Sequence, residues 1–193
     1  MPERSSAFNR FQAAFTHWEP SIHAFTAVSN DITHSGDGLL SGLSVGVKDI
    51  IDVVGLPTHN GSAACADVGA AVQDATVVAC LRGAGAFIAG KTVSTEFAFT
   101  DPSNCRNPHD LNLSPGVSSS GSGAAVAAGI VDIALLVRKR QGRYAVPQPT
   151  VVLLDLSRLS EFCRPWASHR WRVVLTLLGI SAELSNGPPK RFA

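Results

Sequence analysis

The segment GLSVGVKDIIDVV, residues 42–54, decides the predicted fold. Its valines and isoleucines are typical of a strand that is buried in a sheet, and the turn residues GLP at 55–57 end the run. Lys48 lies within this apolar run. Because a buried amine must find a hydrogen-bond acceptor or lose its proton, the segment predicts a polar feature inside a buried strand.

Helix and strand signals follow one another downstream of this segment. QDATVVACLR (73–82) has helical periodicity, with Asp74 and Thr76 placed as N-terminal caps and Gly83 just past the end. AFIA (86–89) is typical of a short buried strand. Strands that alternate with helices predict an α/β fold.

Three further segments complete the pattern. Residues 20–28 indicate a short helical region that leads into a polar loop. Residues 114–122 are rich in serine and glycine and predict a loop, and residues 123–136 predict an alanine-rich helix.

Length and composition are those of one globular domain. The chain has 193 residues, of which 45% are hydrophobic and 16% charged, so it can bury a core. The N-terminal MPERSSAFNRFQAAF carries charges where a secretion signal needs an apolar block. No run reaches the roughly 18 apolar residues of a membrane helix. We therefore expect a cytoplasmic protein that does not contact a membrane.

The cysteines give no sign of a metal site or a disulfide framework. There are four of them, widely spaced and without a C-x-x-C pair: Cys65, Cys80, Cys105 and Cys163. This spacing predicts free thiols in a reducing compartment. We expect neither a metal nor a cofactor.

A net charge of +1 hides a division of the chain at residue 136. Residues 1–136 hold 6 Lys and Arg against 12 Asp and Glu, whereas residues 137–193 hold 10 against 3. Eight of those ten cations are arginine. A basic tail is typical of proteins that bind nucleic acid or anionic lipid. The alternative is that this segment was never selected as protein, in which case its charge indicates no such partner.

A nucleotide-binding pattern, G-x-x-x-x-G-K-[ST], occurs in GAFIAGKT (85–92), and VVLLD (151–155) resembles the strand that holds magnesium in such proteins. A phosphate loop needs a strand before its first glycine and a helix after its lysine. Here the four variable positions are those of the buried strand at 86–89, and the helix precedes the pattern. We therefore expect Lys91 to end a strand, and the chain to bind no nucleotide.

Lys48 and the serine-rich block SPGVSSSGSGAAVAAG (114–129) each have a structural and a catalytic interpretation. As a structural residue, Lys48 would pair with Asp49 or Asp52; as a catalytic residue, a desolvated neutral lysine would act as a general base. By composition the block is a flexible linker. However, Pro115 and the following helix place its serines at a helix N-terminus, where free amides favour a reactive hydroxyl. Serine and lysine can form a nucleophile–base relay without histidine.

Four stretches resemble the amidase signature family in their order and spacing. They are GLSVGVKDIIDVVGLPTHNGS (42–62), DATVVACLRGAGAFIAGKTVSTEFAF (74–99), the NP at 107–108, and SPGVSSSGSGAAVAAGIVDIAL (114–135). The resemblance covers about residues 22–135. It implies an α/β fold with a mixed sheet flanked by helices, which is incomplete in this chain.

The resemblance also implies a catalytic triad of two serines and a lysine. In that family the lysine is the base, a bridging serine relays the proton, and a second serine attacks the amide carbonyl. Lys48 matches the base and Ser118 the bridging serine. Val117 stands where the family usually has a glycine, so Ser119 remains the alternative. The position of the nucleophile is occupied by Gly142, so the nucleophile is absent.

The resemblance ends where the charge balance changes. No serine occurs between Ser122 and Ser157. Codons for VRKRQGR (137–143), read one nucleotide upstream, can encode GTQTAGS, which is typical of the family's nucleophile segment. We therefore hypothesise a frameshift. It divides the chain into a partial amidase domain (1–136) and a non-family basic tail (137–193) that is out of frame and poorly ordered.

The function implied by the resemblance is hydrolysis of a non-peptide amide C–N bond in a small molecule. The missing nucleophile predicts that this chain is inactive. The first alternative is an amidotransferase A-type subunit, which releases the amide of glutamine or asparagine and works with partner subunits. The second is a non-catalytic remnant that binds a partner. A homo-oligomer is compatible with either, and no nucleic-acid partner is expected.

Overall fold

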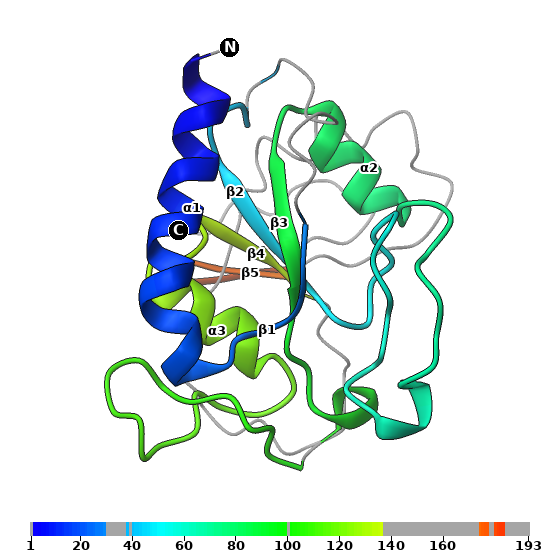
Figure 1. The fold of residues 1–193 in the computed structure, drawn as a ribbon, viewed down its shortest axis with the longest axis vertical. Coiled ribbons are helices and arrows are strands. Elements are labelled where there is room, and N and C mark those ends of the chain that lie inside the picture. Colours follow the sequence, from blue (N-terminus) through cyan, green and yellow to red (C-terminus); the bar gives the residue numbers. More distant parts are fainter. Residues whose placement is uncertain are drawn as a thin grey trace.

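Residues Ser44–Lys48 of the apolar segment 42–54 form an interior strand of a mixed sheet (Figure 1), and the rest of the segment lies outside the strand. The computed structural model describes residues 2–29, 38, 40–99, 101–136, 174–177 and 180–183. Gly142, at the expected position of the nucleophile, lies outside the described residues, as does most of the tail at 137–193.

The sheet has the strand order β1-β3-β2-β4. Strand β2 runs parallel to both β3 and β4, whereas β1 runs antiparallel to β3. All residues of β2 and β3 are buried, as their apolar sequences predict. The strands are β1 (Phe25–Val28), β2 (Ser44–Lys48), β3 (Phe87–Thr92) and β4 (Ile133–Leu135). The predicted α/β fold with a mixed sheet is confirmed.

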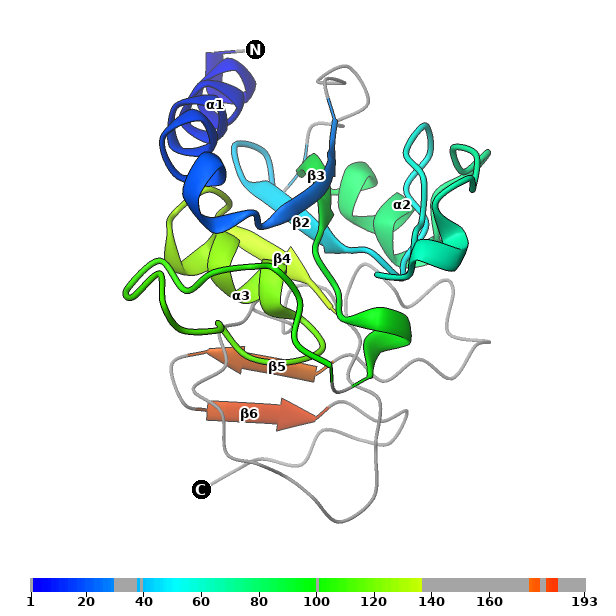
Figure 2. The same ribbon diagram turned by 60° about the horizontal axis from the view of Figure 1, so that its bottom comes forward.

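Helices cover both faces of the sheet (Figures 1 and 2). The α-helices are α1 (Pro2–Ile22), α2 (Thr76–Gly83) and α3 (Ser120–Ala127), and two 3-10 turns are η1 (Ala63–Cys65) and η2 (Glu96–Ala98). The face that packs against α2 is called the α2 face below, and the face that packs against α1 and α3 is called the α3 face.

Each face has its own apolar core. On the α2 face, Val78 and Leu81 of the helix belong to the same cluster as Val47 of β2, and all three are fully buried. On the α3 face, Ala124 of α3 and Phe11 of α1 belong to a second cluster. Alternation of side chains along each strand sends neighbouring residues to opposite cores.

A β-bulge in β3 decides which face each buried lysine occupies. The register between β2 and β3 shifts by one residue at Gly90, where a Cβ atom would lie 2.3 Å from a backbone oxygen of β1. One inserted residue reverses the facing of every later residue in the strand. Lys91 therefore pairs with Val47 on the α2 face, and Thr92 pairs with Lys48 on the α3 face.

Two predicted helical segments are partly wrong. Within 20–28, the helix ends at Ile22 and strand β1 follows, because Glu19 accepts hydrogen bonds from the backbone amides of the next residues. Within 123–136, the helix ends at Ala127 and β4 follows. The short turn between them passes through a glycine with a positive φ of 67°, which alanine periodicity does not reveal.

The predicted helix at 73–82 is confirmed, but its predicted caps are wrong. The N-cap residue is Ala75, which makes no side-chain cap bond, and Thr76 is already helical. Asp74 instead accepts a hydrogen bond from Arg82 Nε at 2.8 Å. The carboxylate therefore ties the start of α2 to its last turn, and Gly83 is the last helical residue.

Two strands are described within the tail. They are β5 (Val174–Leu177) and β6 (Ile180–Glu183), which pair antiparallel and form a separate sheet. The prediction that the tail is poorly ordered otherwise concerns residues outside the described ranges. Within the described part of the chain, no helix is long and apolar enough to cross a bilayer.

Candidate active site

Lys48 is the last residue of β2, and its side chain is fully buried on the α3 face. Its Nζ lies 2.7 Å from Ser118 Oγ and 2.8 Å from Ser119 Oγ. The structure thus brings together the lysine and both serines that the sequence singled out, although Lys48 and Ser118 are 70 residues apart along the chain. A short distance of this kind allows direct proton transfer between amine and hydroxyl.

The carboxylates offered as structural partners of Lys48 have other contacts. Asp49 forms an ion pair with Lys91, with Nζ 2.9 Å from Oδ1. Asp52 accepts a hydrogen bond from Thr58 Oγ1 at 2.8 Å. The two serine hydroxyls, at 2.7 and 2.8 Å, are the contacts of Lys48 on which the proposal below rests.

The two serines lie where an irregular segment turns into α3. Ser119 is the N-cap residue of α3, and Ser118 has a left-handed backbone with φ 72°. Non-glycine residues rarely adopt this conformation, and it occurs at sites where surrounding contacts enforce it. The irregular backbone contradicts the linker interpretation, because residues 118 and 119 are held against a buried side chain.

Further hydroxyl pairs fasten the serine block to the rest of the domain. Thr92 Oγ1 lies 2.7 Å from Ser122 Oγ, and Ser103 Oγ lies 2.6 Å from Ser120 Oγ. Both Ser120 and Ser122 are buried. The sequence does not predict these pairs, because serine and threonine outside a motif give no signal of which hydroxyl they contact.

Lys91, the lysine of the nucleotide-binding pattern, lies in β3 and is fully buried. Besides Asp49, it donates hydrogen bonds to Thr58 Oγ1 at 2.7 Å and to the carbonyl of Pro57 at 3.1 Å. Burial lowers the pKa of Lys91 below its ordinary 10.5, while the hydrogen bond and charge of Asp49 oppose that shift. The predicted strand is confirmed, and the amine is enclosed by protein where a phosphate would need access.

Two hollows in the described surface lie away from this site. One, of about 660 Å³, runs along α1 and reaches Val28. The other, of about 320 Å³, includes Asp52 and Gln73. Lys48 lines neither of them.

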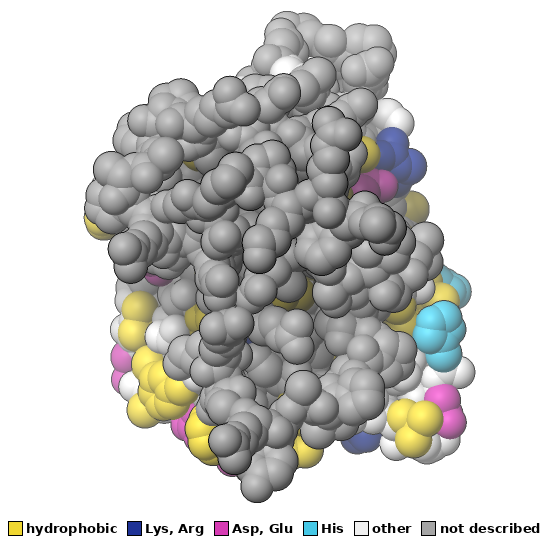
Figure 3. Space-filling model, turned by 180° about the vertical axis from the view of Figure 1, so that it is seen from behind, with side chains coloured by type: hydrophobic (Ala, Val, Ile, Leu, Met, Phe, Trp, Pro, Cys, Tyr) yellow, Lys and Arg dark blue, Asp and Glu magenta, His cyan; other side chains and the backbone are white. Residues whose placement is uncertain are grey.

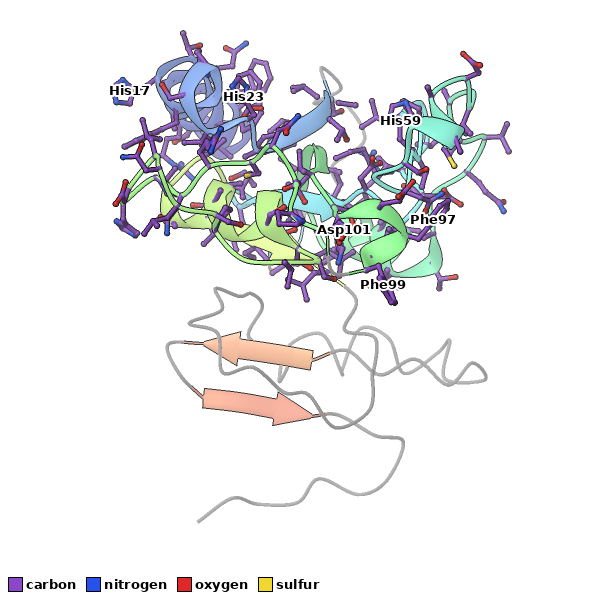
Figure 4. All side chains as sticks on the ribbon, turned by 90° about the horizontal axis from the view of Figure 1, so that it is seen from below. His17, His23, His59, Phe97, Phe99 and Asp101 are labelled. Carbon is purple, nitrogen blue, oxygen red and sulfur yellow. The ribbon has the colours of Figure 1, made fainter. Side chains whose placement is uncertain are left out.

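The described residues contain no cluster of three or more His, Cys, Asp or Glu side chains that could hold a metal ion. Their cysteines are free thiols: Cys65, Cys80 and Cys105. On the back of the molecule, one group of described basic side chains lies beside an acidic one at the upper right, and another lies apart at the lower edge (Figure 3). Figure 4 shows His59 and Phe99 at one end of the domain and His17 at the other, so these ring side chains are not gathered at one site.

Comparisons with known proteins agree with the fold and its extent. The amidase family model matches residues 5–135. The A subunit of the glutamyl-tRNA(Gln) amidotransferase of Methanospirillum hungatei is 43% identical over 125 residues, which are 62% of this chain and 28% of that protein.

Two crystal structures share the fold over a similar part of this chain. That of the glutamyl-tRNA(Gln) amidotransferase A subunit from Thermotoga maritima has a TM-score of 0.63 and 32% identity, covering 69% of this chain and 30% of that one. That of the peptide amidase from Stenotrophomonas maltophilia has a TM-score of 0.60 and 28% identity, covering 69% and 32%. The chain therefore spans under a third of each of these proteins.

Proposed function

This chain belongs to the amidase family, and on that premise we propose that it carries two members of a Ser-Ser-Lys relay for hydrolysis of an amide C–N bond. The observation that carries the proposal is the 2.7 Å contact between Lys48 Nζ and Ser118 Oγ. Lys48 is the base and Ser118 is the bridging serine.

The proposed chemistry moves one proton along this contact. The neutral amine of Lys48 accepts the proton of Ser118 Oγ, which accepts the proton of a nucleophilic serine as that oxygen attacks the amide carbonyl. The proton then returns to the leaving nitrogen, which departs as ammonia or an amine. Water hydrolyses the acyl-enzyme by the same relay. A buried site favours this cycle because desolvation disfavours the charged form of an amine.

The nucleophile is the missing member of the relay. The family's position for it corresponds to Gly142 in this sequence, and glycine has no group that can attack. We therefore propose that the chain does not turn over amides, and that a shift of reading frame near residue 136 removed the nucleophile segment. An intact reading frame across codons 130 to 145 of the gene would contradict the frameshift.

Ammonia release tests the chain directly. The full chain and its Lys48→Ala variant are incubated with a panel of small primary amides, and ammonia is measured over time. We expect no release above that of the variant. Turnover that Lys48→Ala abolishes would refute the inactivity and support the role of the lysine.

A chimaera tests the relay itself. Residues 1–136 of this chain replace the corresponding part of the Thermotoga maritima relative, which supplies the part of the fold that follows. We expect amide hydrolysis that falls at least about 10²-fold in both Lys48→Ala and Ser118→Ala. Ser119→Ala is the matched control, and a larger loss there than in Ser118→Ala would transfer the bridging role to Ser119.

The amidotransferase alternative stands beside the amidase, because the A subunit of an amidotransferase and a putative amidase of Mycobacterium tuberculosis are each 43% identical to this chain. In the amidotransferase case the substrate would be a glutamine or asparagine amide, and the partners would be the other amidotransferase subunits. The chimaera does not distinguish the two, because most of it is an amidotransferase subunit; the gene with its reading frame restored does, since an amidotransferase subunit would prefer glutamine over simple amides. We keep the cytoplasm as the proposed location. A folded, monodisperse chain without any activity would instead favour the binding remnant.

A further inference from the structure

Ser94 lies just after β3 and beneath the serine block, with only 3% of its surface exposed. Its hydroxyl donates to the carbonyl of Ser118 at 3.1 Å and to that of Thr95 at 2.9 Å, so one proton is shared between two carbonyl oxygens. A buried hydroxyl that bonds the backbone of another segment restrains that segment.

Ser118, whose carbonyl accepts the hydrogen bond from Ser94, also has a strained backbone. Ser118 has φ 72°, a conformation that costs free energy for a side chain with a Cβ and persists only when contacts enforce it. The carbonyl that Ser94 holds belongs to the same residue whose Oγ lies 2.7 Å from Lys48 Nζ. Rotation of this backbone unit would therefore carry the Ser118 hydroxyl away from the amine.

A second attachment lies on the other side of the lysine-binding serines. The amide of Gly121 donates to the carbonyl of Val93 at 3.1 Å. The backbones approach so closely that a Cβ atom on Gly121 would lie 2.3 Å from the amide nitrogen of Val93. Val93 and Ser94 thus hold the serine block at two points, one through a backbone carbonyl and the other through its side chain.

We propose that Ser94 is a positioning residue, which keeps Ser118 in the left-handed conformation that turns its hydroxyl toward Lys48. The functional meaning of this role rests on the proposed relay. The geometric claim does not, because it concerns only where the serine block lies against the lysine. The hydrogen bonds of the Ser94 hydroxyl go to backbone carbonyls, so Ser94 acts through the backbone of Ser118.

The test is amine labelling of the full chain, read out lysine by lysine with mass spectrometry. Lys48 and Lys91 are both fully buried, but only Lys48 lies under the serine block. We expect Ser94→Ala to raise the labelling rate of Lys48 by about fivefold, the equivalent of one lost hydrogen bond, while Lys91 keeps its rate. Ser94→Thr, which retains the hydroxyl, should restore the slow rate.

Two further variants separate the role of Ser94 from a general loosening of the serine block or a failure to fold. Ser103→Ala removes a different hydrogen bond of the same block, the one to Ser120, and should change Lys48 labelling less than Ser94→Ala does. Ser94→Cys keeps the side-chain volume but replaces the hydroxyl with a weak donor, so it serves if Ser94→Ala does not fold. Equal acceleration at both lysines, or none at Lys48, would overturn the proposal. Since labelling requires no turnover, this result is independent of the amidase assays.

Discussion

The two faces of the sheet each enclose one fully buried lysine, and they treat it differently. On the α2 face, Lys91 meets the carboxylate of Asp49 at 2.9 Å. On the α3 face, Lys48 meets the hydroxyls of Ser118 and Ser119 at 2.7 and 2.8 Å. The lysines belong to neighbouring strands, so the contrast arises from their partners and not from their depth.

The difference in partner bears on the two proposed roles, a structural amine for Lys91 and a base for Lys48. The negative charge of Asp49 stabilises the protonated, positively charged form of Lys91. A serine hydroxyl offers a proton as well as an acceptor, so the contact of Lys48 with Ser118 can carry a proton in either direction. Both lysines are fully buried and both contact a hydroxyl, since Lys91 also donates to Thr58 Oγ1, so what distinguishes Lys91 is its carboxylate partner.

The largest expected change in stability comes from breaking the ion pair between Lys91 and Asp49 on the α2 face. Lys91→Met keeps the length of the side chain but leaves Asp49 buried without its cation. Removing one partner of a buried ion pair typically costs about 3–5 kcal/mol. We expect a loss of this size in the free energy of unfolding, measured by urea titration followed by circular dichroism.

The double variant Asp49→Asn with Lys91→Met provides the control for this prediction. It removes both charges, so it should regain part of the lost stability. A loss below about 1 kcal/mol in Lys91→Met alone would show that the pair is not enclosed as the structure has it.

A smaller effect is expected on the α3 face. Lys48→Met removes hydrogen bonds to two hydroxyls, which can rotate toward other acceptors. Because each hydrogen bond contributes about 0.5–1.5 kcal/mol, we expect the loss of two to cost about 1–3 kcal/mol by the same titration, less than the loss in Lys91→Met. If Lys48→Met proved as destabilising as Lys91→Met, the distinction between a structural and a reactive lysine would fail.

The sequence predicts the α3 face better than the α2 face. Lys48 and Ser118 stand in distinctive motifs, and an apolar strand with one lysine already requires a polar partner. The mixed sheet follows from the same alternation of apolar and helical segments. The contact between Lys48 and Ser118 could therefore be expected from the amino-acid sequence alone, because it joins two motifs.

The pairing of Lys91 with Asp49 is not legible in this way. It depends on the bulge at Gly90, which reverses the facing of the last residues of β3. A sequence period of two would have sent Lys91 to the α3 face. The extent of α1 was also missed, because its mixed polar sequence carries little helical periodicity and its packing against the sheet decides its length.

Glu19 extends the comparison to acidic groups on the α3 face. Its carboxylate accepts hydrogen bonds at 2.9 Å from the amides of Ala24 and Phe25. Burial raises the pKa of Glu19 above 4.5, and the amides of Phe25 and Ala24 and the charge of His23 oppose the shift. The folded state thus holds the proton more tightly than the unfolded state does, so the contribution is full below pH 4.5 and is lost as pH rises through the folded pKa.

The variant Glu19→Gln tests whether the contribution of Glu19 to stability falls as the pH rises. The free energy of unfolding of the parent chain minus that of the variant should decrease from about pH 4 toward pH 7, because only the parent must bury a developing charge. Urea titrations of both proteins at several pH values measure the difference. A difference that grows with pH would mean that the amide hydrogen bonds outweigh burial.

The smallest expected effect concerns the reactivity of two cysteine thiols. Burial, with the nearby charge of Glu19, raises the pKa of Cys105 to about 12. Because the thiolate is the reactive form, Cys105 on the α3 face should resist alkylation at about pH 8, whereas the half-buried Cys80 of α2 should react. Site-resolved mass spectrometry after iodoacetamide treatment measures both in one sample. Glu19→Gln should raise the alkylation rate of Cys105 only slightly, because burial is the larger cause of its raised pKa. A large increase in that rate would instead show that the charge of Glu19 is the main cause.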